Sequence, residues 1–470
     1  MKDILYKILF FSTIAIMLVF LVQTVHPFVH FEPLNGVSTK TEVPDLTLQN
    51  YVDGSFQKNA EQYCREHFGF REPLIRRYNQ YLWDCFHETN NANVLRGKGN
   101  WLFSLATVRD HYESQMYLYT DDPAEMKQIL ETEALRLWKV QELLKEYNIH
   151  IFVDINPPKD MIYPEYLPRN RSFTRPEGVR AYDYLKKRFD ELGVDYIDFI
   201  PVFRGIKDSV KYQLFPETGT HWSNIASWQA FDSIIRYMED LGNQNLVNLY
   251  IGEMHHHNET RHPDNDLELV LNLASPIKAS KNVYAYVGVE RDSTAAKPNF
   301  LVVGDSYYWN ILNYIPLWEI FQSYPYWYYN STIHGDKEHR STSEVDLEQE
   351  LMQNDYIMLI YNPVTLYEFS SRFLSKALVS LCYDKTTIDS MVREIVETIT
   401  LYNPDLYDKA SHVHEKTGQS LEKVLYDDAL YLLYTEPEKY FKDLEGNKLP
   451  TSRNKDLKAI RQTHISTLIQ

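Results

Sequence analysis

The first residues of the chain hold the feature that most restricts what it can fold into. From Ile4 to Val25 the sequence is almost entirely apolar, and its only charged residue is Lys7. A helix over this range is roughly 33 Å long, about the hydrocarbon thickness of a bilayer. A cleaved signal peptide is the alternative, but the following segment, QTVHPFVHFEPL, offers no small-x-small cleavage pattern. We therefore predict an uncleaved transmembrane signal anchor within residues 1–26.

The distribution of charge predicts how this anchor is oriented and which partners are excluded. Lys2 and Lys7 lie at the start of the span and a long chain follows it, so the positive-inside rule places the N-terminus in the cytoplasm. The whole chain carries 48 Lys and Arg against 65 Asp and Glu, a formal charge of −17. An acidic chain without a long basic run is poorly suited to nucleic-acid phosphates. We expect a single-pass protein of the cell membrane whose bulk is extracytoplasmic, with no nucleic-acid partner.

Changes in the apolar pattern divide the rest of the chain into three parts. Residues 27–54 include Pro27, Pro33 and Pro44 and are interpreted as a linker. Residues 55–384 alternate between strand and helix patterns, which predicts a mostly parallel α/β sheet with helices on both faces. Residues 385–470 are expected to form an α-helical C-terminal region. Strands are expected over 150–155, 194–200, 245–251, 282–289, 299–304 and 355–362, helices over 55–67, 72–88, 123–147, 176–192, 223–241, 267–273 and 306–322, and a hairpin around Gly97–Asn100.

Cysteine and histidine patterns give little reason to expect a metal or other cofactor. Cys64, Cys85 and Cys382 suit an extracytoplasmic domain that does not depend on disulfides, although Cys64 and Cys85 remain a possible pair between neighbouring helices. The run His255–His257 is the one metal-like cluster. Because consecutive side chains of a strand or helix do not converge on one point, we predict a solvated loop there and no metal site.

The strongest chemical signal is a serine at the end of an apolar strand. Phe300-Leu-Val-Val-Gly304 is followed by Asp305 and Ser306 and then by a predicted helix. This places Ser306 at the carboxyl edge of the sheet, where active sites of open α/β folds lie. Gly304 permits the sharp turn of a nucleophile elbow, and the Ser306 N–H is available to an oxyanion. Asp305 is expected to cap or brace the turn. The alternative is a helix cap without chemistry, since Asp and Ser are both good N-caps.

A second motif supplies the base that a serine nucleophile needs. A serine hydroxyl is hardly ionised at neutral pH, so a neighbouring group must take its proton. His221 lies in Gly219-Thr-His-Trp-Ser223, again directly before a predicted helix. Two polar motifs at strand–helix junctions of one sheet can meet at the same edge, which predicts Ser306 as nucleophile and His221 as general base. By itself His221 could equally be a capping residue.

Several further residues are candidates for supporting roles at this edge. Asn330 follows the strand-like YWYY and could supply an oxyanion-hole amide or simply form a turn. Asn156 and Lys159 follow the first sheet strand and could contact substrate, or Lys159 could be solvated. Aromatic side chains around the two motifs could stack on sugar rings or belong to the core: Trp222, Tyr307, Tyr308 and Trp309.

With these motifs in place, the chain resembles the SGNH-hydrolase-like polysaccharide O-acetyltransferases of the alginate-acetylation type (AlgX/AlgJ-like, DHHW-like). The resemblance runs from about residue 66 to 375, and in that family the histidine motif precedes the serine block, as His221 precedes Ser306. It implies a Ser–His–Asp site that transfers acetyl groups to hydroxyls of an extracytoplasmic polysaccharide, commonly beside a membrane-bound O-acyltransferase. The segments that carry it are FGFREPLIRRYNQ, VLRGKGNWLF, NPPKDMIYPEYLP, THWS, VVGDSY and WYYN.

One position departs from the family pattern and keeps other functions open. The family's aspartate lies two residues before the histidine, where this chain has Gly219. That acid fixes the imidazole tautomer and stabilises the imidazolium, and the nearest carboxylate in sequence is Glu217. The expected function is a Ser–His O-acetyltransferase, with Glu217 as a weak substitute acid. The alternatives are a carbohydrate acetyl esterase of the same fold and a catalytically impaired glycan-binding or assembly protein.

Overall fold

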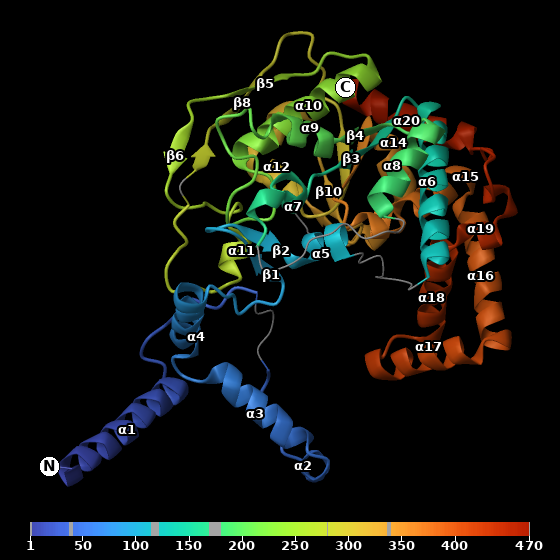
Figure 1. The fold of residues 1–470 in the computed structure, drawn as a ribbon. Helices are drawn as coiled ribbons and strands as arrows, with labels where there is room; N and C mark the ends of the chain where they lie inside the picture. The colour runs from blue at the N-terminus through green and yellow to red at the C-terminus, as the bar shows by residue number, and fades with distance from the viewer. Residues whose placement is uncertain are drawn as a thin grey trace.

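The computed structural model describes residues 2–36, 41–113, 122–168, 180–279, 281–335 and 340–469. Helix α1 (Lys2–Val25) projects from a large α/β body, and α3 (Ser55–His67) diverges from the same region (Figure 1). Ile4–Val25 within α1 is long and apolar enough to cross a membrane, and little of it is buried inside the protein. The start of the helix expected from residue 176 lies outside the described residues.

A six-stranded sheet forms the centre of the body, in the order β11-β10-β9-β12-β3-β4. Neighbouring strands are parallel except β10 and β11, which pair antiparallel. Strands β9 and β12 are buried along their whole length, which explains their continuous apolar sequences. The predicted α/β fold with a mostly parallel sheet is thereby confirmed. The strands are β3 (His150–Ile155), β4 (Tyr196–Asp198), β9 (Phe300–Gly304), β10 (Tyr326–Tyr328), β11 (Thr332–His334) and β12 (Tyr356–Tyr361).

Each face of the sheet has its own apolar core, because side chains alternate along a strand. Ile151, Val153 and Leu359 belong to one core, and Phe152, Val302 and Met358 belong to the other. Helices on both faces therefore bury the sheet, as the strand–helix alternation predicts. The first core includes α6 (Pro123–Lys145), α8 (Ala181–Leu192) and α15 (Phe373–Cys382), and the second includes α9 (Phe199–Ile206), α10 (Asn224–Gly242), α12 (Tyr308–Tyr314) and α13 (Leu317–Ile320).

Local sequence signals explain where the long helix α6 begins and which face it buries. The Asp122 carboxylate accepts a hydrogen bond from the Ala124 N–H at 2.8 Å, and Pro123 occupies the first helical position. The heptad-spaced Leu130, Leu137 and Leu144 are fully buried in the first core. The helix predicted from residue 123 is confirmed.

The C-terminal residues are helical, as predicted, and share the core of the sheet. Val392, Leu425 and Leu433 belong to the same apolar cluster as Ile151. The last helix is fixed by Arg461, whose guanidinium donates to the Met352 and Asn354 carbonyls at 3.0 Å. The helices are α16 (Lys385–Tyr402), α17 (Pro404–Thr417), α18 (Leu421–Thr435), α19 (Pro437–Tyr440) and α20 (Asn454–Ile469).

Four local predictions are wrong for identifiable reasons. The strand expected over 194–200 ends at Asp198, whose carboxylate accepts the Ile200 N–H and caps α9. His255–His257 is not a loop but the strand β6, whose largely exposed side chains left no apolar signal. Among the described residues no group of His, Cys, Asp or Glu could hold a metal ion. The single strand expected over 282–289 is divided into β7 (Asn282–Tyr284), which pairs with β6, and β8 (Val287–Glu290), which pairs with β5 (Asn248–Ile251). The helix expected over 306–322 is interrupted at Pro316, which lies between α12 and α13.

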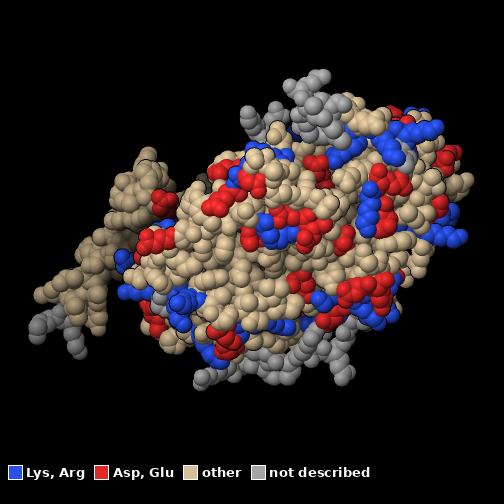
Figure 2. Space-filling model, turned by 90° about the horizontal axis from the view of Figure 1, so that it is seen from above, with Lys and Arg blue, Asp and Glu red and all other residues tan. Residues whose placement is uncertain are grey.

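The remaining elements surround this framework. Cys64 and Cys85 are both exposed and are not bonded to each other. On the face shown in Figure 2, basic and acidic residues are interspersed, while the projecting N-terminal part is nearly uncharged. The other elements are α2 (Leu48–Val52), α4 (Arg71–Tyr81), a π-helical turn (Leu82–Phe86), the hairpin of β1 (Val94–Arg96) and β2 (Leu102–Ser104), α5 (Leu105–Glu113), α7 (Lys159–Ile162), α11 (Asp266–Leu269) and α14 (Leu347–Gln353).

Candidate active site

The turn that carries Ser306 is set by a close contact between two central strands. Gly304 is the last residue of β9, and a Cβ atom there would lie 1.9 Å from the Ile360 carbonyl oxygen of β12. A side chain at position 304 would therefore force the two strands apart. Ser306 follows two residues later, before α12, and its backbone N–H has no acceptor among the described residues. That N–H is available to an oxyanion.

Asp305 braces this turn from inside the protein. Its Oδ2 atom accepts hydrogen bonds from the Asn362 N–H and Nδ2, both at 2.8 Å, and from the Thr365 hydroxyl at 2.7 Å. Its Oδ1 atom accepts from the Tyr307 N–H at 3.0 Å. Burial raises the pKa of Asp305, while these bonds oppose the rise by favouring the carboxylate. The residue ties the end of β9 to the loop after β12.

His221 lies against Ser306 at the same edge of the sheet. Its Nε2 atom is 2.9 Å from the Ser306 Oγ atom. Two residues later, the Ser223 hydroxyl caps α10 by accepting from the Ala226 N–H, and it donates to the Gln213 carbonyl at 2.8 Å. The cap fixes the position at which the chain enters α10. The structure thus brings together the serine and the histidine that the sequence placed at separate strand–helix junctions.

The carboxylate that faces the other imidazole nitrogen belongs to Asp266. Its Oδ2 atom is 3.4 Å from His221 Nδ1, and its Oδ1 atom accepts the Thr220 N–H at 2.7 Å. The first distance is at the limit of hydrogen bonding, and such contacts often shorten when substrate binds. Serine, histidine and aspartate therefore form a continuous line, with the acid supplied by α11 rather than by the histidine motif.

Gly219 explains why the acid lies elsewhere. A Cβ atom at position 219 would lie 2.2 Å from the Asp264 carbonyl oxygen, so the segment that carries Asp266 occupies the space of a side chain. The same segment is held to the histidine loop by the Glu268 N–H, which donates to the Thr218 carbonyl at 3.1 Å. At this position a glycine is required, and an aspartate does not fit without displacing the backbone.

Glu217 is not the carboxylate beside His221, and the structure corrects that assignment to Asp266. Its backbone carbonyl accepts from the Leu102 N–H at 2.8 Å, its side chain is largely buried, and burial raises its pKa. Sequence reasoning missed Asp266 because it lies outside any recognisable motif, in a one-turn helix far along the chain. The glycine at 219 was the available signal, since it indicates close approach of another segment.

Lys159 is buried and holds the loop that carries His221, so it does not face a substrate. Its ammonium group is buried and donates to the carbonyls of Pro216 at 2.9 Å, Glu217 at 3.2 Å and Gly219 at 2.5 Å. Burial lowers the pKa of Lys159 to about 7, and the nearby Asp266 carboxylate opposes the decrease. The expected substrate contact and the solvated alternative are both wrong, because the side chain is enclosed.

The other predicted site residues are mostly buried. Asn156 is completely buried at the end of β3, and its side-chain atoms have no partner among the described residues. Asn330 donates from Nδ2 to the Ser371 carbonyl at 3.0 Å and has a left-handed φ of 49°, which are the properties of a turn residue. Trp222, Tyr307 and Tyr308 belong to the second core and cannot stack on a sugar as they lie.

Trp309 differs from these aromatic residues because it packs at the edge of the second core instead of inside it. It is half-buried, and its ring centroid lies 4.6 Å from that of His334 and 5.2 Å from that of Tyr326. Both neighbouring rings meet it edge-on, which leaves the indole in a defined orientation.

Comparisons with known proteins agree with the predicted resemblance. Residues 94–310 match a family described as "SGNH hydrolase-like domain, acetyltransferase AlgX", which confirms the resemblance, and the match spans His221, Asp266 and Ser306. No curated protein sequence matches the chain. Among solved structures, the O-acetyltransferase domain of Pseudomonas putida AlgJ is 14% identical, with a TM-score of 0.39 over 61% of this chain and 98% of that one. Pseudomonas aeruginosa AlgX is 12% identical (TM-score 0.37; 60% and 66%), and Bacillus cereus PatB1 is 12% identical (TM-score 0.36; 60% and 99%).

Proposed function

We propose that this chain, whose residues 94–310 match the SGNH hydrolase-like domain of AlgX acetyltransferase, is a membrane-anchored extracytoplasmic O-acetyltransferase. Its acceptor is a hydroxyl group of a polysaccharide, and Ser306 carries the acetyl group between donor and acceptor. The observation that carries the proposal is the contact of His221 Nε2 with Ser306 Oγ at 2.9 Å, with Asp266 on the opposite side of the imidazole. These are the groups and contacts that acyl transfer through a serine requires.

The first half-reaction loads the serine. His221 Nε2 takes the proton of the Ser306 hydroxyl as Oγ attacks the carbonyl carbon of the donor's acetyl ester. The Ser306 N–H stabilises the oxyanion of the tetrahedral intermediate. When the intermediate collapses, the bond to the donor oxygen breaks and the leaving group takes the proton from His221. The products are acetyl-Ser306 and the deacetylated donor.

The second half-reaction transfers the group to the glycan. A sugar hydroxyl gives its proton to His221 Nε2 and attacks the acetyl carbonyl, and Ser306 Oγ leaves and recovers the proton. Asp266 keeps the other imidazole proton on Nδ1 in both halves, so that Nε2 is free to accept. It also stabilises the imidazolium that forms twice per cycle. The scheme predicts ping-pong kinetics, with donor and acceptor using one serine in turn.

The proposed location follows from α1 and from the family. Helix α1 is long and apolar enough to span a bilayer, and Lys2 and Lys7 at its start support a body outside the cytoplasm. A membrane-bound O-acyltransferase is the proposed source of the acetyl donor, as in related acetylation systems. The partly exposed Trp309 is the proposed surface for a sugar ring, because the C–H face of a pyranose suits an aromatic ring.

An acetyl-ester assay with full-length protein in detergent tests the proposal. We expect Ser306→Ala to abolish both the release of a chromogenic leaving group and the acetylation of an added oligosaccharide. Ser233→Ala, an exposed serine on α10, is the matched control and is expected to behave as wild type. Equal background activity of wild type and Ser306→Ala would refute the proposed enzyme. Ser306-dependent acetate release that no acceptor diverts would favour the esterase, in which water replaces the sugar.

A further inference from the structure

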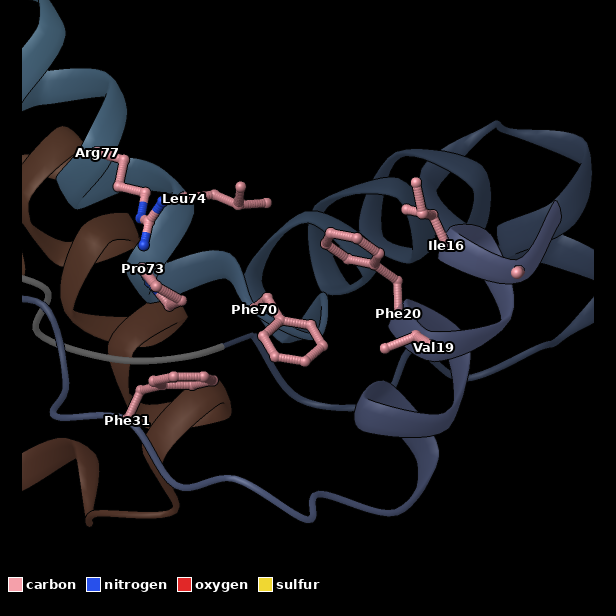
Figure 3. Close-up of a pocket in the computed structure, with 9 residues that line it drawn as sticks. Ile16, Val19, Phe20, Phe31, Phe70, Pro73, Leu74 and Arg77 are labelled. Carbon is pink, nitrogen blue, oxygen red and sulfur yellow. The ribbon is translucent and has the colours of Figure 1, made fainter. Parts of the chain in front are cut away.

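An apolar groove of about 570 Å³ lies where α1 meets the first helices of the extracytoplasmic part (Figure 3). One wall comes from the C-terminal half of α1, and the other comes from α4 and the residue before it. Phe70, on the second wall, lies toward Phe20 of α1 in Figure 3. The volume is within the range of roughly 300–1,000 Å³ that is typical of small-molecule sites. The residues used below are Ile16, Val19 and Phe20 on α1, and Phe70, Leu74 and Arg77 on the opposite wall.

The groove exists because α1 is docked to the segment before α4 rather than tethered loosely. The Gly69 N–H donates to the Thr24 hydroxyl at 2.8 Å, and a Cβ atom at Gly69 would lie 2.7 Å from the Phe20 carbonyl oxygen. The Phe20 ring stacks on Phe68 with 5.1 Å between centroids and meets Phe70 edge-on at 5.2 Å. Contact of the two backbones fixes the angle between α1 and α4, and the wedge between the helices remains open.

The end of α1 is fixed in the same way by Gln23. This side chain is buried, its Oε1 atom accepts the N–H groups of Phe28 and Val29, and its Nε2 atom donates to the Val29 carbonyl at 2.6 Å. The chain therefore turns sharply as it leaves the helix. A sharp, hydrogen-bonded exit is a defined joint between the span and the body.

The lining of the groove has the chemistry of a lipid site. Its lining residues are apolar except for Arg77, whose side chain is exposed and has no ion pair among the described residues. Leu74 is 45% exposed and Ile16 is 57% exposed, so both walls offer apolar surface that water would solvate poorly. An arginine at one end of an apolar groove suits a ligand that has a hydrocarbon chain and an anionic head.

The position of the groove along α1 indicates which lipid reaches it. If the N-terminus is cytoplasmic, the half of α1 that lines the groove lies in the outer leaflet. Ile16 precedes Val25, the end of the helix, by roughly 14 Å, close to half of the hydrocarbon thickness of roughly 30 Å. The exposed wall is continuous with the rest of the span, including Ile8 and Phe11, which are also exposed. The groove is thus reached from within the outer leaflet.

We propose that this groove binds one acyl chain of an outer-leaflet phospholipid, with the lipid phosphate against the Arg77 guanidinium. The inference rests on the membrane anchor of the proposed function and not on the chemistry of Ser306. The bound lipid fills the wedge that the docked helices α1 and α4 leave open.

Photolabelling in liposomes tests the site. Full-length protein is reconstituted in phosphatidylethanolamine and phosphatidylglycerol with a phosphatidylglycerol that carries a diazirine in the middle of one acyl chain. After irradiation, we expect lipid adducts both along α1 and on the peptide that contains Phe70 and Leu74. Leu74→Glu is expected to remove the second adduct, while Leu401→Glu, at a similarly exposed leucine in the C-terminal region, is expected to leave it unchanged.

Arg77→Gln tests the phosphate contact. We expect about a fivefold loss of the second adduct with the phospholipid probe, the factor of one basic residue beside anionic lipid. With a diacylglycerol that carries the same diazirine and no phosphate, wild type and Arg77→Gln are expected to label equally. Unchanged labelling of Arg77→Gln by the phospholipid would overturn the assignment of the phosphate.

The remaining outcomes separate this inference from the proposed function. Adducts on α1 but none on the Phe70–Leu74 peptide would overturn the groove and leave the anchor. The absence of adducts from α1 as well would overturn the anchor itself. A photoreactive amino acid at position 74 that links to a protein rather than to lipid in native membranes would contradict the lipid assignment in favour of a partner helix. Ser306→Ala is expected to label as wild type, and thermal unfolding checks that Leu74→Glu is folded.

Discussion

Replacing Asp266 by asparagine is the sharpest perturbation of the line formed by Ser306, His221 and Asp266. The substitution keeps the shape of the side chain and an oxygen that can accept the Thr220 N–H. It removes the negative charge and places an amide N–H toward His221 Nδ1. An imidazole that accepts at Nδ1 carries its proton on Nε2, and Nε2 can then no longer take the proton of Ser306. We expect kcat to fall while KM for the donor stays nearly constant.

The magnitude follows from the contact itself. A full ion pair at the 3.4 Å between Asp266 Oδ2 and His221 Nδ1 is worth about 5 kcal/mol at an effective dielectric constant of about 20. The Asp266 side chain is 33% exposed, so solvent weakens the interaction. About 3–4 kcal/mol then remain at the transition state, which corresponds to a loss of about 10²–10³-fold in kcat. In a serine protease the same change lowers kcat by about 10⁴-fold, which is an upper limit for this more exposed site.

The assay is steady-state acetyl transfer from a chromogenic acetyl ester to an oligosaccharide. Glu217→Gln is the matched control, because it removes the carboxylate that is nearest to His221 in sequence but not in space. We expect Glu217→Gln to keep kcat close to wild type. A wild-type kcat for Asp266→Asn together with a large loss for Glu217→Gln would refute the assignment of the acid. Thermal unfolding of both variants shows whether any loss comes from misfolding.

Four further predictions follow from single contacts. Lys159→Met leaves three buried carbonyls without their donor, so we expect urea unfolding to show a loss of about 2 kcal/mol or more in the free energy of unfolding. In kinetic assays we expect a lower kcat without a matching rise in KM. Gly304→Ala is expected to destabilise by about 3 kcal/mol or more, because its Cβ meets the β12 backbone at 1.9 Å, whereas Gly205→Ala has open space and is expected to be neutral or stabilising in thermal melts. The double variant Gly219→Asp/Asp266→Asn is expected to have low activity and a reduced melting temperature, because a side chain at position 219 collides with the Asp264 carbonyl. Recovered activity in this variant would contradict the steric explanation. Burial raises the pKa of Asp160 to about 7 from an ordinary 3.8, so the folded state binds this proton more tightly than the unfolded state. The stability that the group contributes is therefore present below about pH 4 and is lost as the pH rises to about 7. Asp160→Asn is expected to raise the free energy of unfolding by about 4 kcal/mol at pH 8 but not at pH 3, and the exposed Asp208→Asn is expected to raise it at neither pH.

The parts of the fold that depend on local sequence could be predicted. The strands β9 and β12 are continuous apolar runs because both of their faces are buried, and α6 begins at an aspartate cap followed by proline. The juxtaposition of Ser306 and His221 could also be predicted, although only Ser306 follows a strand of the sheet, while His221 follows α9. In each case the signal lies within a few residues of the feature it predicts.

The parts that depend on contacts between distant segments could not be predicted. Asp266 lies beside His221 because the segment after Asp264 packs against Gly219. No pattern of residue spacing in the sequence predicts that contact. Glu217 is closer to His221 in sequence, but the carboxylate 3.4 Å from the imidazole belongs to Asp266. Trp222 and Trp309 have similar surroundings in sequence, yet the first is buried in the core and the second is partly exposed. Which aromatic residue is exposed depends on how the helices pack.

The central claim is that Ser306 carries the acetyl group, and trapping that intermediate tests it most directly. The full-length protein is mixed with an acetyl ester donor without any acceptor, quenched in acid within the first turnover, and digested for mass spectrometry. We predict that the peptide containing Ser306 gains the mass of one acetyl group. This acetylated peptide should accumulate more slowly in Asp266→Asn, and it should disappear when an oligosaccharide is added before the quench. Acetyl transfer to the oligosaccharide by wild-type protein with no acetyl group found on Ser306 would contradict the central claim.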